Sequence, residues 1–156
     1  MTEGRSLTPV QQVGEVLSGK MKTQIAQSLD GLGVSPERFV RGALATINAN
    51  PYLAEKCDRG SLYASVLEAA TLGVELSPSL QHAAIVPRKG KASLQLMYKG
   101  IIQLAYNSGK IVAVDTGVVR ERDVFRYVRG TTPTLEHQPS FDADPGEAVA
   151  YYCKKK

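Results

Sequence analysis

The sequence predicts an α+β fold, with N-terminal helices followed by an antiparallel sheet or hairpin region that contains one inserted helix at about residues 98–108. Two observations support this class. Apolar residues recur every three or four positions through the first seventy residues, which is the period of amphipathic helices. Later in the chain the apolar residues alternate, as they do in strands, except in the segment 98–108. Helices and strands that occupy separate parts of a chain are typical of α+β domains.

The first two helices have recognisable start signals. Thr8-Pro9-Val10-Gln11 combines an N-cap threonine, proline at the first helical position and the glutamine of a capping box. The apolar spacing that follows predicts a single helix over 10–29, which ends at Asp30-Gly31. Ser35-Pro36 predicts the start of a second helix, whose apolar stripe is Phe39, Ala43, Leu44 and Ile47.

Two further helical segments precede the strands. Asn50-Pro51 predicts a short helical turn that continues through Glu55. Ser61 is the predicted N-cap of a longer helix that ends at Gly73.

The stretch "HAAIVPRKGKASLQLM", residues 82–97, predicts two strands joined by a Lys89-Gly90 turn. That turn places Ile85 opposite Leu94, and Ala83 opposite Leu96, on one apolar face. After the inserted helix, strands are predicted at 111–119, 124–129 and 147–153. The proline-containing segment 130–146 is predicted to be loop-rich.

The net charge of +4 is concentrated in one part of the chain. Within residues 82–130, three acidic side chains face nine basic ones: Arg88, Lys89, Lys91, Lys99, Lys110, Arg120, Arg122, Arg126 and Arg129. A locally basic segment suggests a polyanionic partner, and a solvated basic face is the equally weighted alternative. Several aromatic residues lie among or after these charges, and one or two of the following six are expected to contact nucleic-acid bases: Tyr98, Tyr106, Phe125, Tyr127, Tyr151 and Tyr152.

The sequence lacks the signature motifs of common enzyme classes. The sequence contains no GxSxG elbow, phosphate-binding loop or HExxH motif, and neither histidine has companions at metal-ligand spacing. A metal-dependent nuclease that uses Asp115 or Asp123 is the main enzymatic alternative, and a basic structural assembly module is another. Cys57 and Cys153 are expected to be plain thiols. No run is long and apolar enough to predict a membrane span.

Tyr98-Lys99-Gly100 is an unusual helix start. A lysine in the first turn opposes the helix dipole, and glycine there costs backbone entropy. A bound phosphate would explain both residues, because the first amide groups and Lys99 would then point at one anion. Gly100 would let the backbone approach that phosphate closely, since it has no Cβ.

Several ordered motifs resemble those of the RecT/Redβ-type phage single-strand annealing proteins, over roughly residues 35–152. The central block is "LQLMYKGIIQLAYNSGKI", preceded by "LYASVLEAATLGVELSPSLQHAAIVPRKG" and followed by "VVRERDVFRYVRGTTPTLEHQP". Within them stand His82 to Pro87, Gln95, Asp123-Val124-Phe125 and His137-Gln138-Pro139.

The resemblance implies ATP-independent binding of single-stranded DNA and annealing of complementary strands in homologous recombination, without a catalytic site. It implies self-assembly into rings or filaments, a partner 5′→3′ exonuclease, and action in the cytoplasm of a bacterial host. It implies neither a metal site nor a cofactor, and leaves dependence on divalent metal open.

The expected DNA-binding residues include Lys99 as the firmest expectation, with Gln95 and Tyr98 lining the groove. The full set is Lys99, Arg88, Lys89, Lys91, Gln95, Tyr98, Gly100, Arg120, Arg122 and Arg126. Residues 1–156 are expected to form a single DNA-binding and annealing domain that is incomplete at its C-terminal end. The N-terminal helix within 1–34 is a candidate contact between copies, with packing on its own domain as the alternative.

Overall fold

The computed structural model describes residues 6–155, and its backbone contacts divide the chain into two compact units. Unit 1 is Met1–Ser108 and unit 2 is Gly109–Lys156. Residues 1–5 of the expected contact segment 1–34, and residue 156 of the expected domain 1–156, lie outside the described residues. Each unit is described by itself below.

The predicted helix over 10–29 is two helices, so this prediction is wrong. α1 spans Pro9–Ser18 and carries the predicted capping box, and α2 spans Lys22–Leu29. Gly19 ends α1, with its amide donating to the Glu15 carbonyl at 2.9 Å, and a non-helical turn follows. The break was hidden in the sequence because the four-residue apolar spacing continues across it, and both helices bury their apolar residues.

Three more helices complete the N-terminal bundle: α3 (Pro36–Ala49), α4 (Tyr52–Glu55) and α5 (Arg59–Leu72). Ser35 caps α3, as predicted. The predicted cap of α5 is wrong, because Asp58 and not Ser61 accepts the capping bond. Asp58 Oδ2 accepts from the Ser61 amide at 2.7 Å, so Ser61 is the third residue of the helix.

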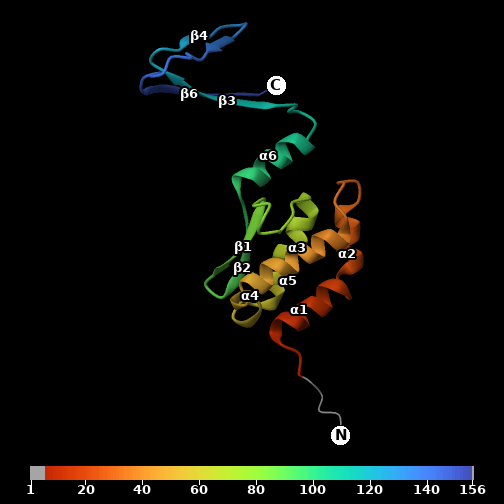
Figure 1. Ribbon diagram of the computed structural model, residues 1–156. Helices are drawn as coiled ribbons and strands as arrows, with labels where there is room; N and C mark the ends of the chain where they lie inside the picture. The colour runs from red at the N-terminus through yellow and green to blue at the C-terminus, as the bar shows by residue number, and fades with distance from the viewer. Residues whose placement is uncertain (1–5, 156) are drawn as a thin grey trace. The chain divides into compact units, whose positions relative to one another are not determined.

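The predicted hairpin is confirmed, including its register. β1 (Ala83–Arg88) and β2 (Lys91–Leu96) pair antiparallel, with Ile85 opposite Leu94 and Ala83 opposite Leu96. Figure 1 shows the hairpin running along one side of the helices of unit 1. Its inner face reaches the core, where Ala83 and Ile85 are both buried.

The core of unit 1 joins side chains from all five helices to the hairpin. Its largest fully buried side chains are Phe39, Leu17, Ile25, Ile47, Leu53 and Leu62. Burial of these apolar side chains fixes the hairpin on α5, and the hairpin in turn determines where the next helix begins.

The inserted helix is confirmed as α6, Tyr98–Asn107, with Ser108 as its C-cap. It follows β2 after a single residue, Met97. The Met97 amide donates to the His82 carbonyl at 3.0 Å, which extends the hairpin pairing up to the first turn of α6.

Unit 2 consists of two separate strand pairs. β3 (Val114–Arg120) pairs with β6 (Ala148–Lys155), and β4 (Val124–Val128) pairs with β5 (Thr134–Gln138), both antiparallel. β3, β4 and β6 were predicted, with ends that differ by a few residues. β5 lies inside the segment 130–146 that was predicted to be loop-rich, so that part of the prediction is wrong.

Together these elements confirm the predicted α+β class, with helices first, antiparallel pairs later and α6 between them. Among residues 6–155, no helix has the combination of length and apolarity that crossing a membrane requires.

Candidate nucleic-acid interface

The tip of the β1–β2 hairpin carries three cationic side chains within four residues. Lys89 and Gly90 form the predicted turn, with φ values of 48° and 78°, and Arg88 pairs with Lys91 across it. Two successive left-handed residues are the requirement of a type I′ turn. All four residues are exposed. The short turn therefore concentrates the charges of Arg88, Lys89 and Lys91 at one protruding point.

The hairpin tip is anchored at the N-terminal end of α5. The Asp58 amide donates to the Gly90 carbonyl at 2.8 Å, and the Ser61 hydroxyl accepts from the Ala92 amide at 2.9 Å. Ser65, buried in α5, donates to the Ala92 carbonyl at 3.2 Å. These bonds give the cationic tip a fixed position, so an approaching anion meets an ordered surface. Sequence reasoning missed this role of Asp58 and Ser61, although the D-x-x-S spacing was available as a capping signal.

Arg88 and Gln95 lie on the outward face of the hairpin and contact each other. The Arg88 Nη2 donates to the Gln95 Oε1 at 3.1 Å, and both side chains are exposed. A guanidinium held by a neutral amide keeps its full charge and several free N–H donors. Arg88, a predicted phosphate contact, thus lies against Gln95, which was predicted to line the groove, and Arg88 remains able to bind a phosphate.

The first turn of α6 has no side-chain cap. Its N-cap is Met97, in extended conformation, and no side chain bonds to the first amides. An uncapped helix start presents several amide donors and the positive end of the helix dipole. Binding of a phosphate at this helix start stays a prediction.

Lys99 extends this positive charge towards the loop that precedes β1. Its Nζ donates to the Gln81 Oε1 at 3.0 Å and lies 6.0 Å from the centre of the Tyr98 ring. Among residues 6–155, Lys99 makes no salt bridge. Its charge is therefore positioned by neutral groups and not cancelled. Tyr98, 65% exposed, is open to an aromatic stacking contact beside that charge.

The reason for glycine at position 100 differs from the expected one. Gly100 is buried, and a Cβ placed there would overlap the carbonyl oxygen of His82, with the carbonyl carbon only 2.8 Å away. The space without a side chain is filled by the protein's own backbone. Close packing of α6 on the residue before β1 accounts for this glycine, and a DNA contact through Gly100 stays a prediction.

The three arginines expected in the interface belong to unit 2, whereas the hairpin and α6 belong to unit 1. Arg120 Nη1 donates to the Gly146 carbonyl at 3.0 Å, and Arg122 Nη1 donates to the Asp144 carbonyl at 2.8 Å. These two guanidinium groups hold the segment that leads into β6. Arg126 is exposed on β4 and makes no salt bridge within residues 6–155. It is the freest of the three for an external phosphate.

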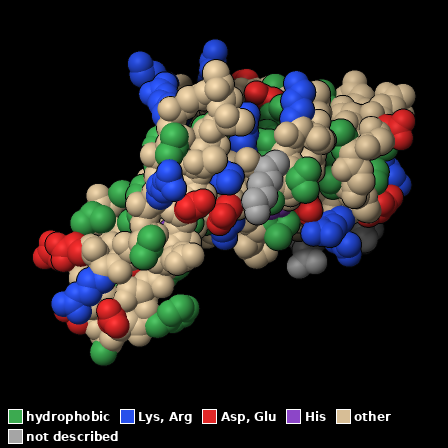
Figure 2. Space-filling model, turned by 90° about the horizontal axis from the view of Figure 1, so that it is seen from above, with side chains coloured by type: hydrophobic (Ala, Val, Ile, Leu, Met, Phe, Trp, Pro, Cys, Tyr) green, Lys and Arg blue, Asp and Glu red, His purple; other side chains and the backbone are tan. Residues whose placement is uncertain are grey.

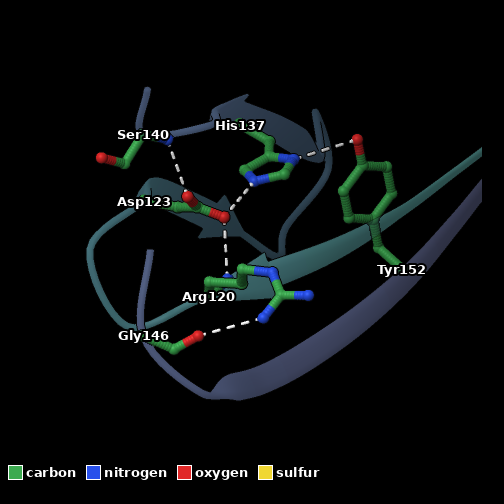
Figure 3. Close-up of polar contacts among 6 residues, drawn as sticks. All are labelled: Arg120, Asp123, His137, Ser140, Gly146 and Tyr152. Atoms are coloured by element: carbon green, nitrogen blue, oxygen red, sulfur yellow. Dashed lines mark hydrogen bonds and ion pairs between the residues drawn. The ribbon is translucent and has the colours of Figure 1, made fainter. Parts of the chain in front are cut away.

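Asp123 and His137, from two separate motifs of the sequence, meet inside unit 2 (Figure 3). His137 Nε2 lies 2.9 Å from Asp123 Oδ2, and His137 Nδ1 lies 3.3 Å from the Tyr152 hydroxyl. Asp123 also accepts from the amides of Ser140, at 2.8 Å, and Arg120, at 2.7 Å. The side chains of Asp123 and His137 are 3% and 7% exposed, so this cluster ties the unit together from within.

The hydrogen bonds to Asp123 stabilise its charged form. The His137 ring, followed by the amides of Ser140 and Arg120, lowers the pKa of Asp123 to about 2, against a smaller opposing effect of burial. A carboxylate with its oxygens so occupied is poorly suited to bind a metal ion. Within residues 6–155, no group of three or more His, Cys, Asp or Glu side chains could hold a metal.

The predicted DNA-binding residues do not all belong to one unit. On the face that Figure 2 draws, Lys and Arg side chains are spread among neutral and apolar ones. The predicted residues thus fall into two groups: Arg88, Lys89, Lys91, Gln95, Tyr98, Lys99 and Gly100 in unit 1, and Arg120, Arg122 and Arg126 in unit 2.

Comparison with known proteins agrees with this arrangement of motifs. The sequence profile of the RecT family matches residues 37–156, which is most of the chain. The chain belongs to the RecT family. It is 34% identical to Protein RecT of Escherichia coli (strain K12) over 132 residues, which are 80% of this chain and 48% of that protein.

A second relative is the uncharacterised protein YqaK of Bacillus subtilis (strain 168), 32% identical over 147 residues. That match covers 93% of this chain and 50% of YqaK. The chain thus spans about half the length of each of these two relatives. The family match includes the hairpin, α6 and both members of the Asp123–His137 cluster.

Proposed function

We propose that this RecT-family chain binds single-stranded DNA and anneals complementary strands during homologous recombination, without ATP and without a catalytic site. The proposal is carried by two features of unit 1, a cationic hairpin tip and, at the other end of β2, an uncapped α6 start beside Lys99. Family membership supports a role in recombination, and the local charges supply the means to bind a phosphate backbone.

Annealing requires a strand that is held by its backbone while its bases stay accessible. Arg88, Lys89, Lys91 and Lys99 contact phosphates, which carry no sequence information. Tyr98 stacks against a base, because its exposed ring stands beside the Lys99 charge. Base edges of the bound strand then remain free to pair with a second strand. The free energy of the duplex drives the reaction, so no nucleotide hydrolysis is needed.

The proposed partners follow from the proposed annealing function. The chain acts as an oligomer, in which neighbouring copies hold one strand in register, and it works with a 5′→3′ exonuclease that exposes single strands. Its proposed location is the cytoplasm of a bacterial cell that carries a phage or prophage. We propose no metal or cofactor as a resident group.

The nuclease alternative is disfavoured by the contacts of Asp123. Both of its carboxylate oxygens accept hydrogen bonds from the protein itself, and its partner His137 is occupied by Tyr152. Asp115, the other candidate, is exposed on β3, opposite Lys154. Neither residue has the array of ligands that two-metal or one-metal hydrolysis uses.

Fluorescence anisotropy with a labelled single-stranded oligonucleotide tests the binding step. Phosphate contacts predict an association constant that falls linearly with salt on a double-logarithmic scale. The slope gives the number of phosphates bound, and Lys99→Ala should lower that slope by about one. An affinity that does not change with salt would contradict the phosphate-binding role. Gel analysis of the same oligonucleotide in magnesium checks that its length is unchanged.

A further inference from the structure

A groove in unit 1 lies where the break between α1 and α2 meets α3. Its volume is about 320 Å³. The apolar part of its lining comes from Pro36, Val40 and Leu44, which are spaced four residues apart on one stripe of α3. Ser18, the last residue of α1, also lines it. The groove is large enough for one phenyl ring and apolar enough to favour it.

The rim of this groove is cationic. Lys22 of α2 and Arg41 of α3 line it, together with Glu37. The Glu37 carboxylate accepts a hydrogen bond from the Ser35 hydroxyl at 3.0 Å, at the start of α3. Among residues 6–155, neither Lys22 nor Arg41 forms a salt bridge. One carboxylate against two cations leaves the lining positive, which suits an acidic occupant.

A loop of unit 2, residues 139–146, has the complementary chemistry. Phe141 is 101% exposed, the highest value among the chain's exposed large apolar side chains. Acidic Asp142 and Asp144 follow it within three residues, and Asp142 has no salt bridge within the described part of the chain. An isolated exposed aromatic flanked by carboxylates is suited to anchor in an apolar pocket with a basic rim.

The loop is held in a defined conformation. The Ser140 amide donates to Asp123 Oδ1 at 2.8 Å, and the Asp142 amide donates to the Ser140 hydroxyl at 3.2 Å. At its other end the Gly146 amide donates to Asp144 Oδ1 at 3.1 Å, and Arg122 pairs with Asp144 at 3.4 Å. Phe141 is therefore presented at little further conformational cost, which favours binding through it.

We infer that the loop 139–146 of one copy docks in the α1/α2/α3 groove of a second copy of this chain. Phe141 fills the apolar part beside Val40 and Leu44, and Asp142 pairs with Lys22 or Arg41 at the rim. The contact joins two different surfaces, so it is heterologous and leaves one groove and one loop free at the ends of an assembly that has not closed into a ring. Successive copies can then add head to tail. The inference rests on the proposed self-assembly and names the surfaces that carry it.

Two variants test the contact, each made in the full chain. Phe141→Ala removes the anchor and leaves the groove, whereas Arg41→Glu reverses the charge of the groove and leaves the loop. Sedimentation velocity and mass photometry should show each variant alone as a monomer, at concentrations where the wild type assembles. Loss of a central aromatic anchor weakens association by roughly 30-fold or more.

A mixture of the two variants gives the decisive result. The intact loop of Arg41→Glu can enter the intact groove of Phe141→Ala, and the dimer formed cannot grow at either end. A one-to-one heterodimer, visible by native mass spectrometry, is expected. A mixture that stays monomeric while each variant has lost assembly would refute a heterologous contact.

Matched controls separate this contact from general surface effects. Lys20→Glu makes the same kind of charge reversal next to the groove, at an exposed residue outside its lining, and Tyr127→Ala removes another exposed aromatic of unit 2. Both should assemble like the wild type. Wild-type-like assembly by Phe141→Ala, or a wild type that stays monomeric, would rule the contact out. Single-strand binding, measured separately by anisotropy, shows whether the proposed function survives that outcome.

Discussion

The carbonyl oxygen of His82 occupies the space that a side chain at Gly100 would need, and the same oxygen accepts a hydrogen bond from the Met97 amide at 3.0 Å. One backbone group thus fixes both the N-cap and the first turn of α6. The position of Lys99, between these residues, follows from this contact. The packing of Gly100 on His82 and the position of the Lys99 charge are therefore linked.

Gly100→Ala tests that link. The added methyl overlaps backbone, which cannot rotate away, so we expect the free energy of unfolding to fall by about 1–3 kcal/mol. Urea denaturation measures it. Gly130→Ala makes the same chemical change at a residue with nothing within 4 Å of the added atom, and it should stay within about 0.5 kcal/mol of the wild type. Equal effects from the two substitutions would contradict the close contact.

Gln81→Ala removes the neutral partner of the Lys99 ammonium group. Lys99 keeps its charge but loses its position, so single-strand affinity should fall less than with Lys99→Ala, and the salt slope should stay unchanged. Anisotropy titrations at several salt concentrations separate the two effects. A smaller salt slope of the association constant for Gln81→Ala would mean that Gln81 acts on more than the orientation of Lys99.

The Asp123 carboxylate makes the stability of unit 2 depend on pH. Its pKa is lowered from 3.8 to about 2 in the folded chain, chiefly by the hydrogen bond to His137. A lowered pKa means that its stabilisation is fully present above the unfolded value and is lost as the pH falls through about 2. Denaturation between pH 6 and pH 2 should show this loss. Asp123→Asn should be less stable at pH 6 and should lack that part of the pH dependence.

Arg122 and Arg126 are expected to behave differently although both are exposed arginines. Arg122→Ala frees Asp144, so hydrogen exchange at the Gly146 amide, which donates to Asp144 Oδ1, should become faster. Arg126→Ala should leave that exchange unchanged and lower single-strand affinity instead. If Arg122→Ala lowered single-strand affinity and Arg126→Ala changed the exchange at Gly146, the proposed roles would be contradicted and Arg122 would be the DNA contact.

The sequence predicted elements where a local pattern and the tertiary structure agree. The hairpin register followed from alternation about Lys89-Gly90, because only one pairing buries Ala83 and Ile85 together. The break at Gly19 was missed, since apolar spacing alone cannot distinguish one helix from two that share a core. β5 was missed because its five residues show only Leu135 and His137 as inward positions, too few to establish a period.

The candidate site was predictable in its charges and not in its contacts. Lys99 and Arg88 could be identified as cations, but their amide partners Gln81 and Gln95 depend on tertiary structure. Gln81 adopts a φ of 55°, which no local signal indicates. The division of the ten predicted residues between two units likewise depends on contacts made far apart in the sequence.

Annealing of two complementary labelled oligonucleotides, followed by fluorescence transfer in EDTA and without ATP, tests the central claim most directly. We expect the wild-type chain to accelerate duplex formation, Lys99→Ala to lose most of that acceleration, and Lys20→Glu, an exposed lysine of the α1–α2 turn, to retain it. Acceleration that requires a nucleotide or a metal, or no acceleration by a wild-type chain that binds single strands, would contradict the proposal that this chain anneals DNA by holding its backbone.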